Sequence, residues 1–366
     1  MSEDKREIVQ KEAYQKTLEY KRLSLVISMR LGKTRIGCMK LKSLYDQDPD
    51  FRALIVAPKV SIYESWKDEL KKLNMEYILN NIKFSTYISL QKQHQEYDIV
   101  ILDEVHQLRI TKVDWLNSYN GLILGLTGTP PVKNSNTARL INIFCPVKYT
   151  YMVSDAVDEN ILNDYRIMIH EVKLSDKKNL KVNMPNGGYF YTSEIENYKF
   201  WSNKIFEATS PKQRQIASVM RMKMMQEYPS KMNYAKDLLS KIEDKCIVFV
   251  NTKEQADDIC TKSYHSGNPD SNVNLLDFKA GEIDKLSCVL QINEGITIED
   301  LKQGIITHFY SNNSSKGLQR WARLLGLSND DLAICHILCF EGTVDEDWVD
   351  KGLESLDQNK IKYVKF

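Results

Sequence analysis

Two short groups of residues combine a cation, a hydroxyl and two carboxylates in a way that suits hydrolysis of a nucleoside triphosphate. The first is Gly32-Lys33-Thr34 and the second is Asp103-Glu104-Val105-His106. A glycine before a helix lets backbone N–H groups surround a phosphate, a lysine reaches the β- and γ-phosphates, and a threonine hydroxyl binds Mg²⁺. Asp103 can complete the Mg²⁺ shell while Glu104 orients the attacking water.

Each group follows an apolar run that predicts a buried β-strand. Residues 23–27 precede the first group and residues 97–102 lead directly into the second. Alone, the first group also fits a polar turn and the second a charged turn. Because ligands of parallel sheets bind at the carboxyl ends of strands, their combination favours a nucleotide site. Arg30 and Arg35 are further candidate nucleotide contacts.

The elements around these groups predict an α/β protein with two tandem domains, residues 1–157 and 158–366. In both, apolar strand-like runs alternate with helical stretches, which is typical of a doubly wound parallel sheet. We expect a helical insertion at about residues 176–231. The helical stretch from Phe190 to Leu239 is expected to cover the second sheet, with a nucleic-acid contact as the alternative. The predicted strands are 25–27, 53–56, 99–102, 122–126, 165–170, 246–250, 288–292, 304–307 and 333–340.

Composition excludes several classes of protein. The 366 residues suffice for two domains, and the chain is 42% hydrophobic and 27% charged. We find no apolar run near the ~18 residues of a membrane span and no signal-peptide core, so we expect a cytoplasmic protein without a membrane partner, in the host cytoplasm if phage-encoded. A net charge of +1 indicates that any nucleic acid is bound by a local groove.

Seven scattered cysteines predict neither a disulfide framework nor a paired Cys-x-x-Cys zinc site. Cys335, His336 and Cys339 come nearest to a metal cluster, but they lie in the apolar run 332–340. Successive strand residues alternate faces, so His336 points away from the two cysteines. A buried strand is therefore favoured over a metal site.

Further motifs, in a fixed order, resemble those of superfamily two helicases. Residues 124–130, with hydroxyls at Thr127 and Thr129, are similar to motif III, and the segment 53–59 with Trp66 resembles motif Ia in a form shared with Swi/Snf-type translocases. The set resembles a DExH-type helicase, closest to compact phage enzymes of the UvsW type. The remaining matches are 247–252 to motif IV, 264–267 to the loop after it, 293–296 to motif V and 319–323 to motif VI.

This resemblance implies two RecA-like P-loop domains with ATP and Mg²⁺ between them. It implies an arginine finger at Arg323, Gln319 near the γ-phosphate, and Gln10 where such proteins read adenine. His106 would act as a coupling residue beside the γ-phosphate. The other implied coupling residues are Thr127, Thr129, Gly295 and Arg320, and the implied nucleic-acid contacts are Lys59, Thr86, Asn251 and Thr252.

The chain departs from the family pattern at a few positions. Arg30 replaces the usual second glycine of the phosphate loop, and Ala322 and Gly326 stand where motif VI usually has a glycine and a second arginine. The leading hypothesis is an ATP-dependent DNA helicase or translocase. We expect it to act as a monomer on single-stranded, duplex or branched DNA, with replication or recombination proteins as possible partners. An RNA helicase and a low-turnover ATP-gated clamp are the alternatives.

Overall fold

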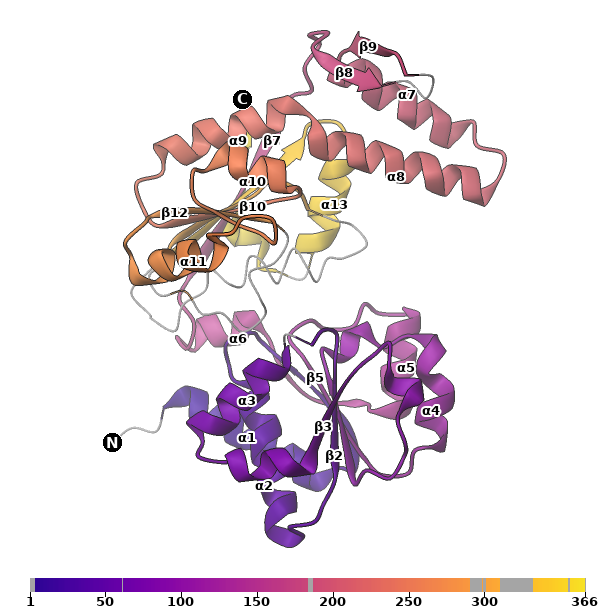
Figure 1. Cartoon of the computed structure of the whole chain (residues 1–366), viewed down its shortest axis with the longest axis vertical. Helices are drawn as coiled ribbons and strands as arrows, with labels where there is room; N and C mark the ends of the chain where they lie inside the picture. Colours follow the sequence, from indigo (N-terminus) through magenta and orange to yellow (C-terminus); the bar gives the residue numbers. More distant parts are fainter. Residues whose placement is uncertain are drawn as a thin grey trace. The chain divides into compact units, whose positions relative to one another are not determined.

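The chain folds into two compact units, of which the first ends at Asn163 and the second begins at Asp164. Each contains one large sheet whose strands all run parallel to their neighbours (Figure 1), which confirms the predicted α/β class. This computed structural model describes residues 4–60, 62–183, 187–289, 298, 301–309, 332–354 and 356–365.

The sheet of the first unit places all its strand ends at one edge, because every pairing is parallel. Its inner strands are almost wholly buried, since nearly every residue in them is apolar. The two edge strands are more polar and partly exposed. The strand order is β3 (Ile82–Thr86), β2 (Ala53–Ala57), β4 (Ile99–Asp103), β5 (Leu122–Thr127), β1 (Arg22–Ile27) and β6 (Val147–Tyr151).

Helices cover both faces of this sheet, as Figure 1 shows. One group packs together on the side of the phosphate loop, and a second group closes a core cluster that includes Trp115, Leu116 and Leu140. The first group is α1 (Lys5–Glu19), α2 (Lys33–Gln47) and α3 (Ile62–Lys72). The second is α4 (Val113–Ser118) and α5 (Asn136–Phe144), and α6 (Val153–Asp158) ends the unit.

The second unit repeats this architecture with a seven-stranded parallel sheet. The predicted strands at 165–170, 246–250, 304–307 and 333–340 are confirmed, and the one at 288–292 is observed as far as Val289. The order is β11 (Ser263–Tyr264), β12 (Lys285–Val289), β10 (Cys246–Val250), β13 (Gln303–Ile306), β14 (Ala333–Phe340), β7 (Tyr165–Val172) and β15 (Ile361–Lys365).

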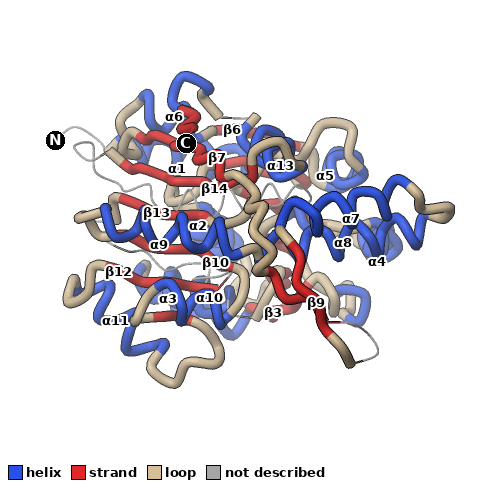
Figure 2. The backbone as a smooth tube through the Cα atoms, turned by 90° about the horizontal axis from the view of Figure 1, so that it is seen from above, coloured by secondary structure: helices blue, strands red, loops and turns tan. Residues whose placement is uncertain are grey.

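Short-range sequence signals set the ends of the helices in the second unit. For example, Thr252 and Gln255 form a capping box at the start of α10. Figure 2 distinguishes the helices from the parallel strands. Among the residues that the structure describes, the helices of the second unit are α7 (Glu194–Phe206), α8 (Pro211–Glu227), α9 (Pro229–Lys241), α10 (Lys253–Ile259), α11 (Ser271–Ala280) and α13 (Val344–Leu353).

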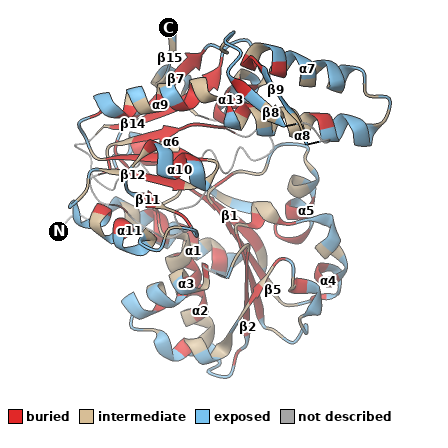
Figure 3. Ribbon diagram, turned by 45° about the horizontal axis from the view of Figure 1, so that its top comes forward, coloured by how far each residue is buried: buried red, intermediate tan, exposed pale blue. Residues whose placement is uncertain are grey.

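The predicted insertion differs in part from expectation. Helix α9 covers the second sheet as predicted, contributing Met232, Ala235 and Leu239 to its core. By contrast, α7 and α8 pack on each other and are largely exposed (Figure 3), because each has only a few apolar residues facing a core. A separate two-stranded hairpin, β8 (Leu180–Asn183) and β9 (Tyr189–Thr192), precedes them. In the part of the chain that the structure describes, no helix is both long and apolar enough to cross a bilayer.

Candidate nucleotide site

The residues after β1 form a tight loop that leads into α2. Gly32 is the N-cap of α2, has φ 88°, and supplies no side-chain acceptor to the N–H groups of the first turn. Those N–H groups suit a phosphate at the helix N-terminus. A Cβ on Gly32 would lie 2.6 Å from the side-chain nitrogen of Gln10, so glycine satisfies both the backbone conformation and the space.

Arg30 adopts a backbone conformation that glycine reaches without steric cost. Its φ is 66°, in the left-handed region that costs an L-residue about 1–2 kcal/mol. The loop therefore keeps a glycine-like backbone shape at this position in spite of the substitution. A contact between the Arg30 guanidinium and a nucleotide stays a prediction, as does one from Arg35, which is half-buried in the first turn of α2.

Gln10 reaches the loop from α1. Its side chain is buried, and its Nε2 donates to the carbonyl oxygen of Leu31 at 2.8 Å. Helix α1 is thereby attached to the segment that precedes Gly32. The adenine contact that the sequence predicts for Gln10 is untested, but its position beside the phosphate loop agrees with a role at the nucleotide.

Lys33 lies at the ends of strands β1 and β5. Its Nζ donates to the carbonyl oxygen of Ile27 at 3.3 Å, at the end of β1. A Cβ on Gly128, just after β5, would come within 3.0 Å of the same Nζ, so the glycine leaves room for the lysine. The positive charge of Lys33 opposes the rise in the pKa of Asp103 that burial causes, and it helps to lower the pKa of Glu104, so all three groups share one electrostatic environment.

Asp103 is the last residue of β4, and its carboxyl group is held by a tryptophan. The indole Nε1 of Trp66 donates to Asp103 Oδ2 at 2.9 Å, and the Tyr87 hydroxyl donates to the Asp103 carbonyl oxygen at 2.9 Å. Burial, followed by the negative charge of Glu104, raises the pKa of Asp103 to about 7. A nearby cation would relieve this unfavourable burial of charge.

Trp66 belongs to the segment that resembles motif Ia, but the sequence predicts no contact between it and the nucleotide site. Its spacing in α3 with Ile62 and Leu70 predicts only a core position, and its ring is indeed fully buried against Gly37 of α2, where a Cβ would lie 2.4 Å away. No sequence signal indicates which acceptor its N–H would find. The structure shows that one side chain links α2, α3 and the end of β4.

Glu104 and His106 form a short relay toward β5. Glu104 has φ 51°, and its Oε2 lies 3.3 Å from His106 Nδ1, which is also 2.8 Å from Thr127 Oγ1. A carboxylate only accepts, so we assign the proton to His106 Nδ1. Burial pushes the pKa of Glu104 up, but the hydrogen bond from His106 and the charge of Lys33 outweigh it and hold the pKa below its usual range.

The hydroxyl of Thr127 extends this relay into motif III. It accepts from the N–H of Thr129 at 3.0 Å and donates to the Thr129 carbonyl oxygen at 3.0 Å. A continuous set of polar contacts therefore runs from Glu104 through His106 to the loop after β5. The geometry therefore supports the predicted coupling roles of His106, Thr127 and Thr129 without testing them.

The site leaves buried polar atoms that a nucleotide would satisfy. Within the described residues, His106 Nε2 and Thr129 Oγ1 are buried and have no hydrogen-bond partner. Such atoms are rare in folded proteins unless a ligand or water completes them. Together with the loop around Gly32, they fit a triphosphate and an attacking water.

The donor set also fits Mg²⁺. Thr34, in the first turn of α2, and Asp103 would be its protein ligands, while phosphate oxygens and waters supply the remaining positions. No cluster of three or more His, Cys, Asp or Glu side chains within the described ranges could hold a metal by itself. His336 instead bonds His170 at 2.9 Å and Gln303 at 3.1 Å.

The candidate nucleic-acid residues lie at or just after strand ends. Lys59 follows β2, and Thr86 ends β3 with its hydroxyl 3.3 Å from Ser89 Oγ. Asn251 and Thr252 follow β10, and Thr252 Oγ1 caps α10 by accepting from the N–H of Gln255 at 3.2 Å. Both hydroxyls thus have local structural roles, and their phosphate contacts stay predictions. Gly295, Gln319, Arg320 and Arg323 lie outside the described residues.

Parts of the chain are similar to a restriction-enzyme subunit and to a helicase. Residues 5–132 match the family model "Type III restriction enzyme, res subunit". The "Uncharacterized killer plasmid pGKL-2 helicase" of Kluyveromyces lactis is 25% identical over 232 residues, which are 55% of this chain and 37% of that protein. The chain thus spans well under half the length of this curated relative.

Solved structures share the fold at low sequence identity. The helicase domain of Pyrococcus furiosus Hef is 15% identical, with a TM-score of 0.52 over 93% of this chain and 96% of that one. The type ISP restriction-modification enzyme LlaBIII, solved bound to DNA, is 14% identical with a TM-score of 0.62 over 98% and 31%. Mycobacterium smegmatis Lhr, bound to single-stranded DNA and AMP-PNP, is 13% identical with a TM-score of 0.56 over 94% and 47%.

Proposed function

We propose that this chain, a superfamily two helicase with two RecA-like domains, hydrolyses ATP to move along DNA or to remodel it. The observation that carries the proposal is the meeting of Lys33, Asp103 and the Glu104–His106–Thr127 relay at one sheet edge. DNA is proposed over RNA because related structures such as LlaBIII and Lhr are described as bound to DNA.

Each side chain has a separate task in the proposed hydrolysis. Bound Mg²⁺ would neutralise phosphate charge and polarise the bond to be cleaved. Lys33 binds the β- and γ-phosphates. Glu104 stays ionised, as its low pKa requires, and orients a water for attack on the γ-phosphorus. His106 contacts Glu104 on one side and Thr127 on the other. Loss of the γ-phosphate can therefore change the position of the loop after β5.

The test is an ATPase assay with single-stranded DNA, duplex DNA, forked DNA and RNA at one salt concentration, because affinity for nucleic acid depends strongly on salt. We expect DNA to stimulate hydrolysis. Lys33→Ala should abolish hydrolysis by weakening nucleotide binding, and Glu104→Gln should abolish it while ATP still binds. Strand displacement on the forked substrate then separates unwinding from tracking.

The matched controls are Lys83→Ala and Glu76→Gln, which alter exposed residues of the same unit. Both should keep full activity. A rate of ATP hydrolysis that does not change when nucleic acid is added would contradict the proposal. Stimulation by RNA alone would replace DNA with RNA, and tight DNA binding with almost no turnover would favour the ATP-gated clamp.

A further inference from the structure

The hairpin of β8 and β9 presents an uncovered aromatic face. Its register pairs Lys181 with Tyr191 and Asn183 with Tyr189, so these four side chains share one face of the two-stranded sheet. The opposite face, with Leu180 and Val182, packs on a core cluster of the second unit. Tyr189 and Tyr191 are each 56% exposed, which is far more than folding of the hairpin requires.

The exposed side chains are arranged as a platform. The rings of Tyr189 and Tyr191 meet edge to face with centroids 5.8 Å apart, and Lys181 Nζ lies 4.2 Å from the centroid of the Tyr189 ring. This face therefore holds two aromatic rings and an ammonium group in mutual contact. Aromatic rings that bases can stack on, beside cations that hold phosphates, are how proteins bind single strands without sequence preference.

The hairpin belongs to a longer segment, residues 173–227, which we call the arm and which adds positive charge. Residues 173–227 contain ten Lys or Arg and five Asp or Glu, a net charge of +5 in a chain whose total is +1. Two of the acids are engaged locally: buried Glu194 accepts from the N–H groups of Ser175 and Ser230, and Glu196 completes the cap of α7. These hydrogen bonds leave both carboxylates charged, so the net charge of the arm stays +5.

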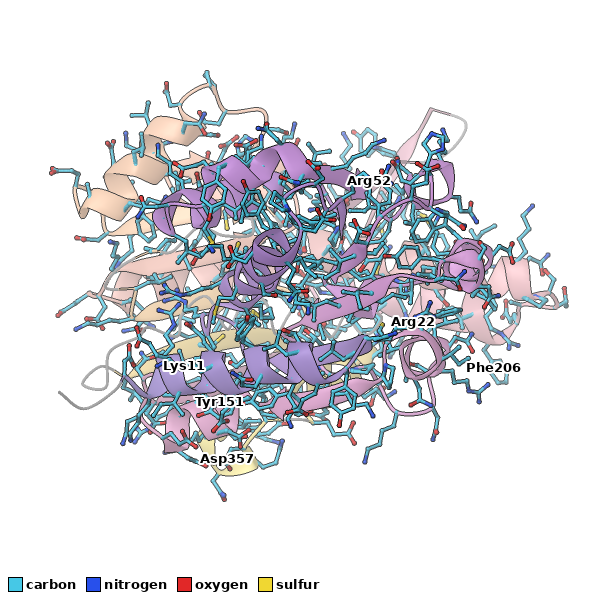
Figure 4. All side chains as sticks on the ribbon, turned by 90° about the horizontal axis from the view of Figure 1, so that it is seen from below. Lys11, Arg22, Arg52, Tyr151, Phe206 and Asp357 are labelled. Atoms are coloured by element: carbon cyan, nitrogen blue, oxygen red, sulfur yellow. The ribbon has the colours of Figure 1, made fainter. Side chains whose placement is uncertain are left out.

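The helical hairpin of the arm repeats the same chemistry. In Figure 1, α7 and α8 run side by side away from the large sheet of the second unit. On α7, Lys204 Nζ lies 5.8 Å from the ring centroid of Phe200, and Phe200 is 51% exposed. Phe206, labelled in Figure 4, ends the helix and is almost fully exposed. Exposed aromatics and lysines thus occur on two elements of the arm.

We propose that Tyr189, Tyr191 and Lys181 form a binding site for single-stranded DNA, separate from the motifs at the ends of the large-sheet strands. Bases stack on the two tyrosines and phosphates lie near Lys181. A protein partner would fit an apolar patch equally well, but the net positive charge favours a polyanion. The inference rests on the proposed function for the choice of DNA, whereas the stacking site itself follows from the hairpin.

The experiment measures binding of a fluorescent oligo-dT strand to the full chain by anisotropy, without nucleotide and over a range of salt. The double variant Tyr189→Ala/Tyr191→Ala should weaken binding about tenfold or more, because stacking is worth about 1–3 kcal/mol per base. Tyr189→Phe/Tyr191→Phe keeps both rings and should keep the affinity. Lys181→Ala should also reduce the slope of log affinity against log salt by about 0.7.

Tyr77→Ala, which removes a tyrosine of 44% exposure from the first unit, is the matched control and should bind as the native chain does. The double alanine variant should keep its thermal unfolding midpoint and its DNA-free ATPase rate. Unchanged affinity in that variant would overturn the site but leave the proposed function intact, whereas failure of the native chain to bind any strand would count against both. The proposed site would also be overturned by an equal loss of affinity for blunt duplex DNA, whose base faces are hidden, or by a change in oligomeric state.

Discussion

The Mg²⁺ ligand expected at Asp103 depends on an indole N–H. Replacing Trp66 with phenylalanine keeps an aromatic ring against Gly37 but removes the 2.9 Å hydrogen bond to Asp103 Oδ2. Hydrogen bonds to charged groups contribute about 1.5–3 kcal/mol. We expect Trp66→Phe to lower kcat for ATP hydrolysis about tenfold or more and to raise the Mg²⁺ concentration needed for half-maximal rate.

A second buried tryptophan of the same unit provides the control. The Trp115 indole donates to the Gln93 carbonyl oxygen at 2.9 Å, and neither residue belongs to one of the motifs. Trp115→Phe should cost roughly 1 kcal/mol of stability without altering the Mg²⁺ dependence of hydrolysis. If Trp66→Phe behaved like Trp115→Phe in both measurements, the tryptophan would have only a packing role.

Single residues also show where sequence reasoning stops. The closeness of Lys33 to Asp103 and Glu104 is predictable, because each ends or follows a strand in a parallel sheet. The link from Trp66 to Asp103 is not, since a buried tryptophan has the same sequence pattern whichever acceptor it meets. Arg30 is intermediate: comparison with the family pattern shows that it replaces a glycine, and only the structure reveals its positive φ.

At the scale of elements, the inner strands of both sheets were predictable and the edges were not. Strands such as β10 consist wholly of buried apolar residues. Edge strands β6 and β15, by contrast, have mixed burial, because one side of each has no neighbouring strand. Their sequences lack the apolar run on which the prediction depended. The hairpin of β8 and β9 was missed for the same reason.

A partly buried hydrogen-bond chain joins five elements or loops of the second unit. Asp244 accepts from Gln303 Nε2 at 2.6 Å, so the Gln303 oxygen faces His336 Nε2–H at 3.1 Å. His336 Nδ1 then accepts from His170 Nε2–H at 2.9 Å, and His170 Nδ1 accepts from the Tyr234 hydroxyl at 2.8 Å. The bond between the two imidazoles requires a neutral His336, because a proton on His336 Nδ1 would set two N–H donors against each other.

The hydrogen bonds between these imidazoles predict that the second unit becomes less stable in acid. Burial lowers the pKa of His170 to about 4, and burial with the neighbouring His170 lowers that of His336 to about 4. In the unfolded chain both would have a pKa of about 6.5. Their stabilising contribution is therefore complete above about pH 6.5 and is lost as pH falls toward 4, by about 2 kcal/mol per histidine between pH 7.5 and 5.

Urea unfolding at pH 7.5 and 5 checks this expectation. The double variant His170→Gln/His336→Gln should lose less stability than the native chain between the two pH values, even if it starts from a lower value. His94→Gln, at an exposed histidine of the first unit, should keep the native pH dependence. Parallel behaviour of the native chain and the double variant would show that other groups set the acid sensitivity.

At the scale of the whole molecule, the two units divide the proposed chemistry between them. Lys33, Asp103 and Glu104 belong to the first unit, which contains the features expected to bind ATP. The resemblance to superfamily two helicases assigns the arginine finger to Arg323, which lies outside the described residues. Nucleotide binding and hydrolysis should then respond differently to a change in the second unit.

Replacing Arg323 with alanine tests that division. The variant should bind ATP within a few-fold of the native affinity, because the phosphate loop is unchanged, while kcat falls by about 10³ or more, as expected for loss of an arginine finger. Arg166→Ala, which removes an exposed arginine from β7, should leave both quantities unchanged. Near-native kcat in Arg323→Ala would mean that the first unit hydrolyses ATP without help. Movement on DNA could not then be driven by closure of two domains on ATP, and the coupling through His106 and Thr127 would have to carry the signal alone.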